Sequence, residues 1–207
     1  MLNNLINRYP ELKNSRESLE KASELLLYTV KNDGKILLCG NGGSCADCDH
    51  IVGELMKGFL SKRKINEEFR ERLKSEYPDE ADYFAENLQE GIQAISLTSH
   101  AAVLSAFAND VSADMSYAQL VYGYGRKGDL LIGLSTSGNS KNVVNAVKIA
   151  KAKGMHTIAL TGERPCKLDM CDVVVKAPET ETFKVQELHL PIYHYICAKL
   201  EYDLYGE

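Results

Sequence analysis

The stretch DLLIGLSTSGNSKNVVNAVKIAKAKGMHTIALT, residues 129–161, contains two apolar runs separated by a polar loop and a helical pattern. The runs 129–134 and 156–161 are apolar at nearly every position, which is typical of strands that are buried on both faces. Residues 140–153 between them have the pattern of a helix. Because parallel strands need such a crossover helix, this stretch predicts one unit of a parallel α/β sheet.

The same alternation runs through the rest of the chain. Further strands are predicted at 35–39, 94–98 and 172–177, and helices at 11–32, 44–57, 100–108, 114–123 and 182–203. The predicted fold class is therefore α/β, a three-layer α/β/α sandwich with a five-stranded parallel sheet between helical layers.

At 207 residues, the chain fits a single domain spanning 1–207, with an N-terminal helical segment at 1–33. Residues 61–90 interrupt the α/β alternation, and about half of them are charged. We interpret this insertion as a solvated helical excursion on the surface. A lid or a contact between subunits is the alternative.

The composition excludes some classes of protein. Hydrophobic residues make up 44% and the formal net charge is −5, which is ordinary for a globular protein and argues against a surface for nucleic acid. No apolar run is long enough to span a membrane. The N-terminal sequence MLNNLINRYPELKNS has neither the basic start nor the apolar core of a signal peptide, so we expect a cytoplasmic protein.

Six cysteines include the pair Cys45 and Cys48, spaced as in a redox motif at a helix start. Together with Cys166 and Cys171 they would also supply four thiolates for zinc. The second pair has a wider spacing and no other ligand nearby. We favour small, apolar, reduced cysteines in a reducing compartment.

Two loops that follow predicted strands have the composition of phosphate sites. GNGGS at 40–44 and STSGNS at 135–140 place glycines and hydroxyls at the start of a helix, where backbone N–H groups and the helix dipole favour an anion. The first loop lacks the third glycine and the downstream acidic residue of a dinucleotide fingerprint, so no nucleotide cofactor is expected. In the alternative interpretation, Ser140 only caps its helix and its neighbours form a turn.

Four polar side chains on two predicted helices are candidates for chemistry. His50 and Glu54 are four residues apart and face the same way. Gln186 and His194 are eight residues apart, about 80° around the helix axis, so they share a broad face. Each half is weak evidence alone, because a histidine on an apolar helix is more often a core residue, and spacing does not separate His194 from His189. Pro191 is expected to bend this helix.

Several of these motifs together resemble one known family. GNGGS, DHIVGEL, SAFAND, GDLLIGLSTSGNSKNVVNAVKIAKAKGM, IALTG and TFKVQELHLPIYHYIC occur in the order found in phosphoheptose isomerases, which belong to the SIS (sugar isomerase) fold group with a flavodoxin-like sheet. The resemblance covers nearly the whole chain except 61–90. It implies interconversion of sedoheptulose 7-phosphate and D-glycero-D-manno-heptose 7-phosphate through an enediol, for activated-heptose biosynthesis.

The resemblance also implies roles for individual residues. Glu54 and His194 would move protons, and in some members the positions of His50, Glu54, Gln186 and His194 bind zinc. Asp110, Thr182 and Gln186 would position the sugar. The phosphate would be held by Ser44, Ser135, Thr136, Ser137 and Ser140, with Asn41, Gly42 and Gly43 beside them. The family further implies a homotetramer with active sites between subunits, in which the N-terminal and C-terminal helices pack.

Two departures from the family pattern leave alternatives open. The chain has Lys57-Gly58-Phe59 where the family often has Gly-Arg-Phe, so an arginine near the substrate is missing, and residues 61–90 exceed the usual connection. The alternatives are a non-catalytic SIS protein that binds a replication initiator and an isomerase of another sugar phosphate. Retention of Glu54 and His194 favours an enzyme.

Overall fold

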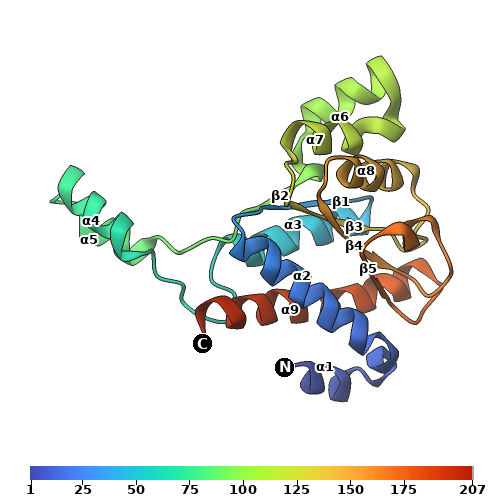
Figure 1. Cartoon of the computed structure of the whole chain (residues 1–207), viewed down its shortest axis with the longest axis horizontal. Coiled ribbons are helices and arrows are strands. Elements are labelled where there is room, and N and C mark those ends of the chain that lie inside the picture. The colour runs from blue at the N-terminus through green and yellow to red at the C-terminus, as the bar shows by residue number, and fades with distance from the viewer. Residues whose placement is uncertain (207) are drawn as a thin grey trace.

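The computed structural model describes residues 1–206, and its centre is a five-stranded, all-parallel sheet (Figure 1). The strands lie in the order β2-β1-β3-β4-β5. Their bounds are β1 (Ile36–Gly40), β2 (Ala94–Ser96), β3 (Leu130–Leu134), β4 (His156–Thr161) and β5 (Val173–Lys176). The predicted fold class is thus confirmed.

Helices cover both faces of the sheet. One face packs against α2 (Arg16–Lys31), α3 (Gly43–Met56) and α9 (Thr182–Tyr205), and the other against α7 (Ser116–Tyr124) and α8 (Lys141–Ala152). Successive side chains of a strand point to opposite faces, so Ile36 and Leu38 join the first core while Leu37 and Cys39 join the second. This explains why the strands are apolar at every position.

Short helical turns interrupt the chain in two of the predicted helical regions. The helical segment predicted at 1–33 contains two α-helices, α1 (Leu2–Arg8) and, after a 3₁₀ turn at 10–15, α2. Pro10 disfavours helical backbone at Tyr9, which separates these elements. A π-helical turn at 108–112 and a 3₁₀ turn at 113–115 lie between α6 (Ala101–Phe107) and α7. Helix α9 continues through Pro191 to Tyr205.

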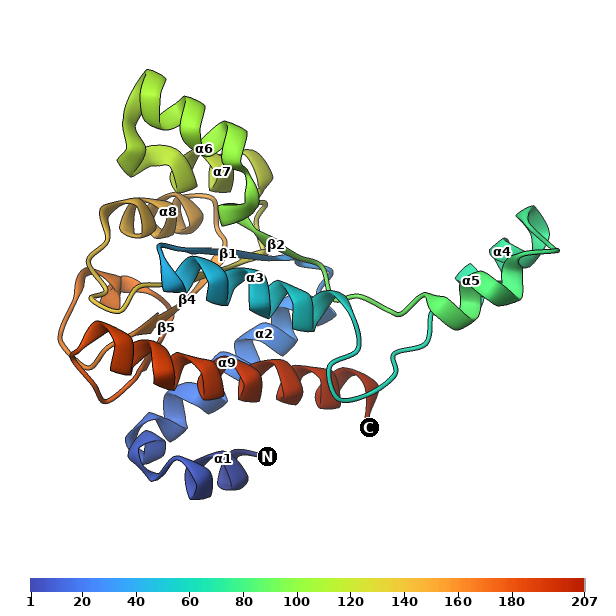
Figure 2. The same ribbon diagram turned by 180° about the vertical axis from the view of Figure 1, so that it is seen from behind.

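The charged insertion contains two short helices that extend away from the sheet (Figures 1 and 2). They are α4 (Glu67–Glu76) and α5 (Ala81–Asn87), and a single antiparallel bridge joins Lys64 to Gln89 at their base. We call residues 64–89 the arm. No helix among residues 1–206 has the length and apolar character needed to cross a membrane.

The chain just before the arm is held tightly against α9. Arg63 and Glu201 are both buried and their side chains are 2.7 Å apart. Glu201 also accepts hydrogen bonds from the backbone N–H groups of Phe59, Leu60 and Ser61. We call residues 57–63 the anchored loop.

Candidate active site

The two glycine- and serine-rich loops meet at the point where the strand order of the sheet changes direction. β1 and β3 are neighbours, but β1 continues into α3 on one face and β3 into α8 on the other. Ligands of open parallel sheets collect at the carboxyl ends of strands at such a switch point. The amides of Asn41 and Asn142 exchange two hydrogen bonds of 2.9 Å, which tie the first loop to the start of α8.

The loop after β1 requires its glycines for two physical reasons. Gly42 has φ of 56° and ψ of −122°, a conformation that costs other residues strain. A Cβ at Gly43 would lie 2.5 Å from Nε2 of Gln186, so the α9 side chain can approach only glycine here. Ser44 follows, buried in the first turn of α3.

The loop after β3 arranges hydroxyls at the start of α8. The Ser135 and Ser140 hydroxyls are 3.0 Å apart, and the Asn139 N–H donates to Oγ of Ser137 at 3.2 Å. Among residues 1–206, the Ser140 hydroxyl pairs with Ser135 and makes no hydrogen bond that caps the helix. The alternative in which Ser140 acts only as a cap therefore loses its main support.

A small pocket of about 170 Å³ lies beside this second loop. Thr136, Ser137 and Thr182 line it, together with Arg164 from the loop after β4. Arg164 was not identified from the sequence, because nothing in its local pattern distinguishes it from other exposed arginines. Glu163 and Glu179 also line the pocket, so its charge is mixed.

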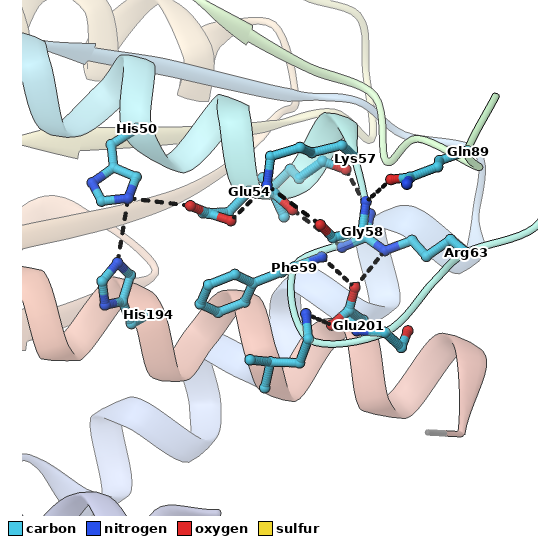
Figure 3. Close-up of polar contacts among 12 residues, drawn as sticks. His50, Glu54, Lys57, Gly58, Phe59, Arg63, Gln89, His194 and Glu201 are labelled. Atoms are coloured by element: carbon cyan, nitrogen blue, oxygen red, sulfur yellow. Dashed lines mark hydrogen bonds and ion pairs between the residues drawn. The ribbon is translucent and has the colours of Figure 1, made fainter. Parts of the chain in front are cut away.

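Three of the predicted chemical side chains meet between α3 and α9 (Figure 3). Nε2 of His50 lies 3.2 Å from Oε1 of Glu54 and 3.4 Å from Nε2 of His194. His50 and His194 are 144 residues apart in the chain. The helical spacing within α3 and the packing of α9 against α3 therefore create one cluster of two imidazoles and a carboxylate.

The charges around this cluster suit proton transfer. Burial and the neighbouring His50 lower the pKa of His194, although Glu54 acts in the opposite direction. The His194 imidazole is therefore neutral near pH 7 and can accept a proton. The Glu54 side chain is only 14% exposed, and Nζ of Lys57 lies 3.4 Å from its second oxygen. Lys57 thus faces the Glu54 carboxylate directly. It belongs to the Lys57-Gly58-Phe59 stretch that stands where the family often has Gly-Arg-Phe.

The cluster has donors that suit zinc. In a tetrahedral site with bonds of about 2.0–2.1 Å, neighbouring donor atoms are about 3.3 Å apart. The His50–Glu54 and His50–His194 distances match that spacing. However, no group of three or more His, Cys, Asp or Glu side chains within residues 1–206 is gathered around one metal position. The donors fit by type and by pairwise distance, and a metal would have to bring them closer to a common centre.

Other predicted site residues lie apart from the cluster. The Gln186 side chain lies against Gly43, and no hydrogen bond within residues 1–206 links it to His50, Glu54 or His194. Seven residues of helix separate Gly43 from His50, which is about 10 Å along α3. Asp110 is exposed on the π-helical turn and accepts a hydrogen bond from Asn109.

Two of the remaining sequence candidates, His189 and Cys48, are buried in the core. His189 is fully buried, and burial lowers its pKa to about 4, so it is a neutral residue of the core. His194, in contrast, belongs to the cluster. All six cysteines are free in the described part of the chain. Burial raises the pKa of the Cys48 thiol, which keeps it protonated and unreactive. Burial supports the interpretation as small apolar cysteines for Cys39, Cys48 and Cys197, whereas Cys45, Cys166 and Cys171 are half-buried.

Three side chains that contact the cluster were missed. The Phe59 ring lies 5.6 Å from the His194 ring, and the Tyr193 hydroxyl contacts both Asp47 and His50. Asp47 offered a signal, because Asp47, His50 and Glu54 follow the helical spacing i, i+3 and i+7. Tyr193 and Phe59 offered none, since their positions depend on how α3, α9 and the anchored loop pack.

The fold and this site define a parallel α/β protein in which a cluster of two imidazoles and a carboxylate accompanies two loops whose composition suits an anion. Comparison with known proteins agrees with that class. The SIS domain family model matches residues 2–94 and 85–162. The phosphoheptose isomerase of Aliarcobacter butzleri (strain RM4018) is 37% identical over 194 residues, covering 93% of this chain and 89% of that protein. That of Helicobacter pylori (strain P12) is 36% identical, covering 92% and 86%.

Solved structures give the same result. The phosphoheptose isomerase GmhA from Neisseria gonorrhoeae superposes with a TM-score of 0.70 at 33% identity, covering 96% of this chain and 97% of that one. A phosphoheptose isomerase from Francisella tularensis gives a TM-score of 0.74 at 25% identity, covering 96% and 93%. The chain therefore belongs to the phosphoheptose isomerase family of SIS-domain proteins.

Proposed function

We propose that this protein is an aldose–ketose isomerase that interconverts sedoheptulose 7-phosphate and D-glycero-D-manno-heptose 7-phosphate. The observation that carries the proposal is the meeting of Glu54, His50 and His194 within 3.2–3.4 Å contacts. The family relationship supports the choice of substrate. The product would supply a pathway to nucleotide-activated heptose.

The reaction needs two proton movements between adjacent carbons. Glu54 removes the proton from the carbon next to the carbonyl, which gives an enediol. His194, held neutral by its surroundings, serves the other proton movement as the acid and base partner. A positioned acid or base of this kind contributes about 10²- to 10⁴-fold to the rate.

The phosphate end of the substrate is assigned to the switch-point loops. Backbone N–H groups at the starts of α3 and α8 and the paired Ser135 and Ser140 hydroxyls favour an anion there. Asp110, Thr182 and Gln186 are assigned to the sugar. The phosphate contacts in this proposal come from Asn41, Gly42, Gly43, Ser44, Ser135, Thr136, Ser137 and Ser140.

Zinc is part of the proposal, with one ion per site held by His50, Glu54, Gln186 and His194. When bound there, zinc would polarise the substrate carbonyl and stabilise negative charge on the enediolate. Donor types and two donor distances support this assignment for His50, Glu54 and His194, and Gln186 would have to turn from Gly43 toward them. A carboxylate bound to a metal is a weaker base, so Glu54 would serve its two roles in different states of the cycle.

We also propose a cytoplasmic homotetramer with active sites between subunits. Support comes from a groove of about 520 Å³ next to His194, which is open to a neighbouring molecule. Apolar side chains from α1, the anchored loop and α9 line it, including Leu5, Leu60 and Leu190. Light scattering of the purified protein tests the assembly, and a monomeric mass would contradict it.

The function is tested by incubating the purified protein with sedoheptulose 7-phosphate, with added zinc or with a chelator, and following aldoheptose phosphate by NMR. We expect conversion that the chelator reduces. If the protein converts shorter or amino-substituted ketose phosphates in preference to the heptose, the proposed substrate is wrong and the preferred sugar phosphate takes its place. No conversion of any of them would contradict the proposed enzyme.

A further inference from the structure

A buried tyrosine connects His50 to a second carboxylate. Tyr193 is 2% exposed, and its hydroxyl oxygen lies 3.0 Å from Nδ1 of His50 and 3.2 Å from Oδ1 of Asp47. The Tyr193 ring also meets the His50 and His194 rings edge to face, at 5.4 and 5.0 Å. These contacts lie on the side of His50 that faces away from Glu54.

The direction of this hydrogen-bond chain follows from its ends. A carboxylate can only accept, so the single phenolic proton of Tyr193 is donated to Asp47. The phenolic oxygen can then accept a hydrogen bond from Nδ1–H of His50 when that nitrogen carries the ring proton. A phenol titrates near pH 10, so the Tyr193 hydroxyl carries its proton at neutral pH and can donate it.

A metal ion bound by His50 would take the lone pair of Nε2, and Nδ1 would then carry the ring proton. Without a metal, the Glu54 carboxylate 3.2 Å from Nε2 can also only accept, so it favours a proton on Nε2. Nε2 is the atom that faces Glu54 and His194. A histidine that binds a metal through one nitrogen usually donates a hydrogen bond from the other, which fixes its tautomer and ring orientation. The chain from His50 through Tyr193 to Asp47 has that form, with the phenol as a relay.

We propose that Tyr193 and Asp47 are positioning residues that hold the His50 ring with Nδ1 directed at the Tyr193 hydroxyl and Nε2 directed at Glu54 and His194. This inference deepens the proposed function, since it concerns the same site. Its geometry does not depend on the identity of the sugar. The second oxygen of Asp47 is buried without a hydrogen-bond partner among residues 1–206, so Tyr193 is the principal polar contact of this carboxylate.

The test compares Tyr193→Phe with Tyr195→Phe, a matched loss of a buried hydroxyl two residues along α9. In the zinc-loaded protein, ¹H–¹⁵N NMR observes the Nδ1–H of His50, and hydrogen bonding to Tyr193 slows its exchange with water. We expect slow exchange in the wild type and in Tyr195→Phe, and fast exchange in Tyr193→Phe. Fast exchange in the wild type, or equally slow exchange in Tyr193→Phe, would overturn the proposal.

Zinc affinity gives a second readout, measured by competition with a chromophoric chelator. Loss of such an outer hydrogen bond typically weakens metal binding about 10- to 100-fold. We expect that loss in Tyr193→Phe and in Asp47→Asn, with Tyr195→Phe within about twofold of the wild type. Equal affinities in all variants would contradict the inference. If the variants change zinc affinity but the protein does not isomerise the heptose, the inference on Tyr193 and Asp47 stands and only the proposed substrate is rejected.

Discussion

The anchored loop and the arm adjoin each other in the chain and are both rich in charge, but they use charge differently. In the anchored loop, Arg63 and its partner Glu201 have side chains that are 0% and 1% exposed. In the arm, Lys74 and Glu71 pair at 2.7 Å with side chains 46% and 59% exposed. A buried charge that loses its partner is costly, whereas an exposed pair is worth little.

This difference shows that the buried pair in the anchored loop, and not the exposed pairs of the arm, supports the side-chain cluster. The Arg63 guanidinium also donates to the backbone carbonyls of Leu55 and Glu54, at 2.7 and 3.2 Å (Figure 3). Arg63 therefore satisfies the C-terminal end of the helix that carries His50 and Glu54. Glu201 fixes the backbone of Phe59, whose ring lies beside His194. The arm has no comparable link to the cluster among the described contacts.

The largest expected effect is on turnover when the cluster itself is changed. His194→Asn should lower kcat for sedoheptulose 7-phosphate by about 10²- to 10⁴-fold, because one of the two proton movements loses its imidazole. His156→Asn, at the start of β4, is the matched control and should leave kcat nearly unchanged. Steady-state kinetics measures both. An active His194→Asn enzyme would remove His194 from the mechanism.

The next largest effect is on folding. Arg63→Met should lower the free energy of unfolding by about 3–5 kcal/mol, because Glu201 would remain buried without its cation. Arg72→Met in the arm removes an exposed pair with Glu68 and should cost no more than about 1 kcal/mol. Urea unfolding of the two variants tests the comparison directly, and equal losses would refute it.

The same pair predicts a dependence on pH. Burial raises the pKa of Glu201, but the N–H groups of Phe59 and Leu60 and the Arg63 side chain outweigh it and lower the net value. A group whose pKa is lower in the folded state stabilises the fold above its unfolded pKa of about 4.3 and loses that contribution as the pH falls through the folded value. Stability should therefore decline below pH 4–5 more steeply in the wild type than in Glu201→Gln.

A smaller effect is expected at the phosphate loop. Ser140→Ala removes the hydroxyl that pairs with Ser135. A hydrogen bond to a charged group is worth about 1.5–3 kcal/mol, so KM should rise roughly 10- to 100-fold while kcat changes little. An unchanged KM would place the phosphate elsewhere, and the nearby pocket lined by Arg164 would be the first region to examine.

The smallest effect is expected from removing the arm. Lys64 and Gln89 are paired, so Asn-Gly can replace residues 65–88 as a two-residue hairpin turn. If the arm is a surface excursion, kcat, KM and the assembled mass should match those of the wild type. A change in kinetics would indicate a lid, and a change in mass would indicate a contact between subunits.

Much of the fold could be predicted from local pattern. Runs such as 36–40 and 130–134 are apolar at every position because both faces of the sheet are covered, and that property is visible in the sequence. The order of the strands could not be predicted from local pattern, because it depends on which face of the sheet each crossover helix covers. The sequence indicated a helical segment at 1–33 with its main helix starting after Pro10, but it did not define α1 as a separate helix.

The site was only partly predictable for a similar reason. His50 and Glu54 meet through helical spacing alone, and the two loops follow adjacent strands. The approach of Gln186 to Gly43, and of Tyr193 to Asp47 and His50, depends on the packing of α9 on α3. The buried pair of Arg63 and Glu201 lies 138 residues apart in the chain, so no local pattern could indicate it.

The central claim is that Glu54 moves a proton of a bound sugar phosphate. The most direct measurement is kcat and substrate affinity of Glu54→Gln with sedoheptulose 7-phosphate, with the exposed Glu76→Gln of the arm as control. We predict that Glu54→Gln binds the sugar phosphate nearly as the wild type does but turns it over at least about 10²-fold more slowly. Turnover by Glu54→Gln equal to that of the wild type and of Glu76→Gln would contradict the account.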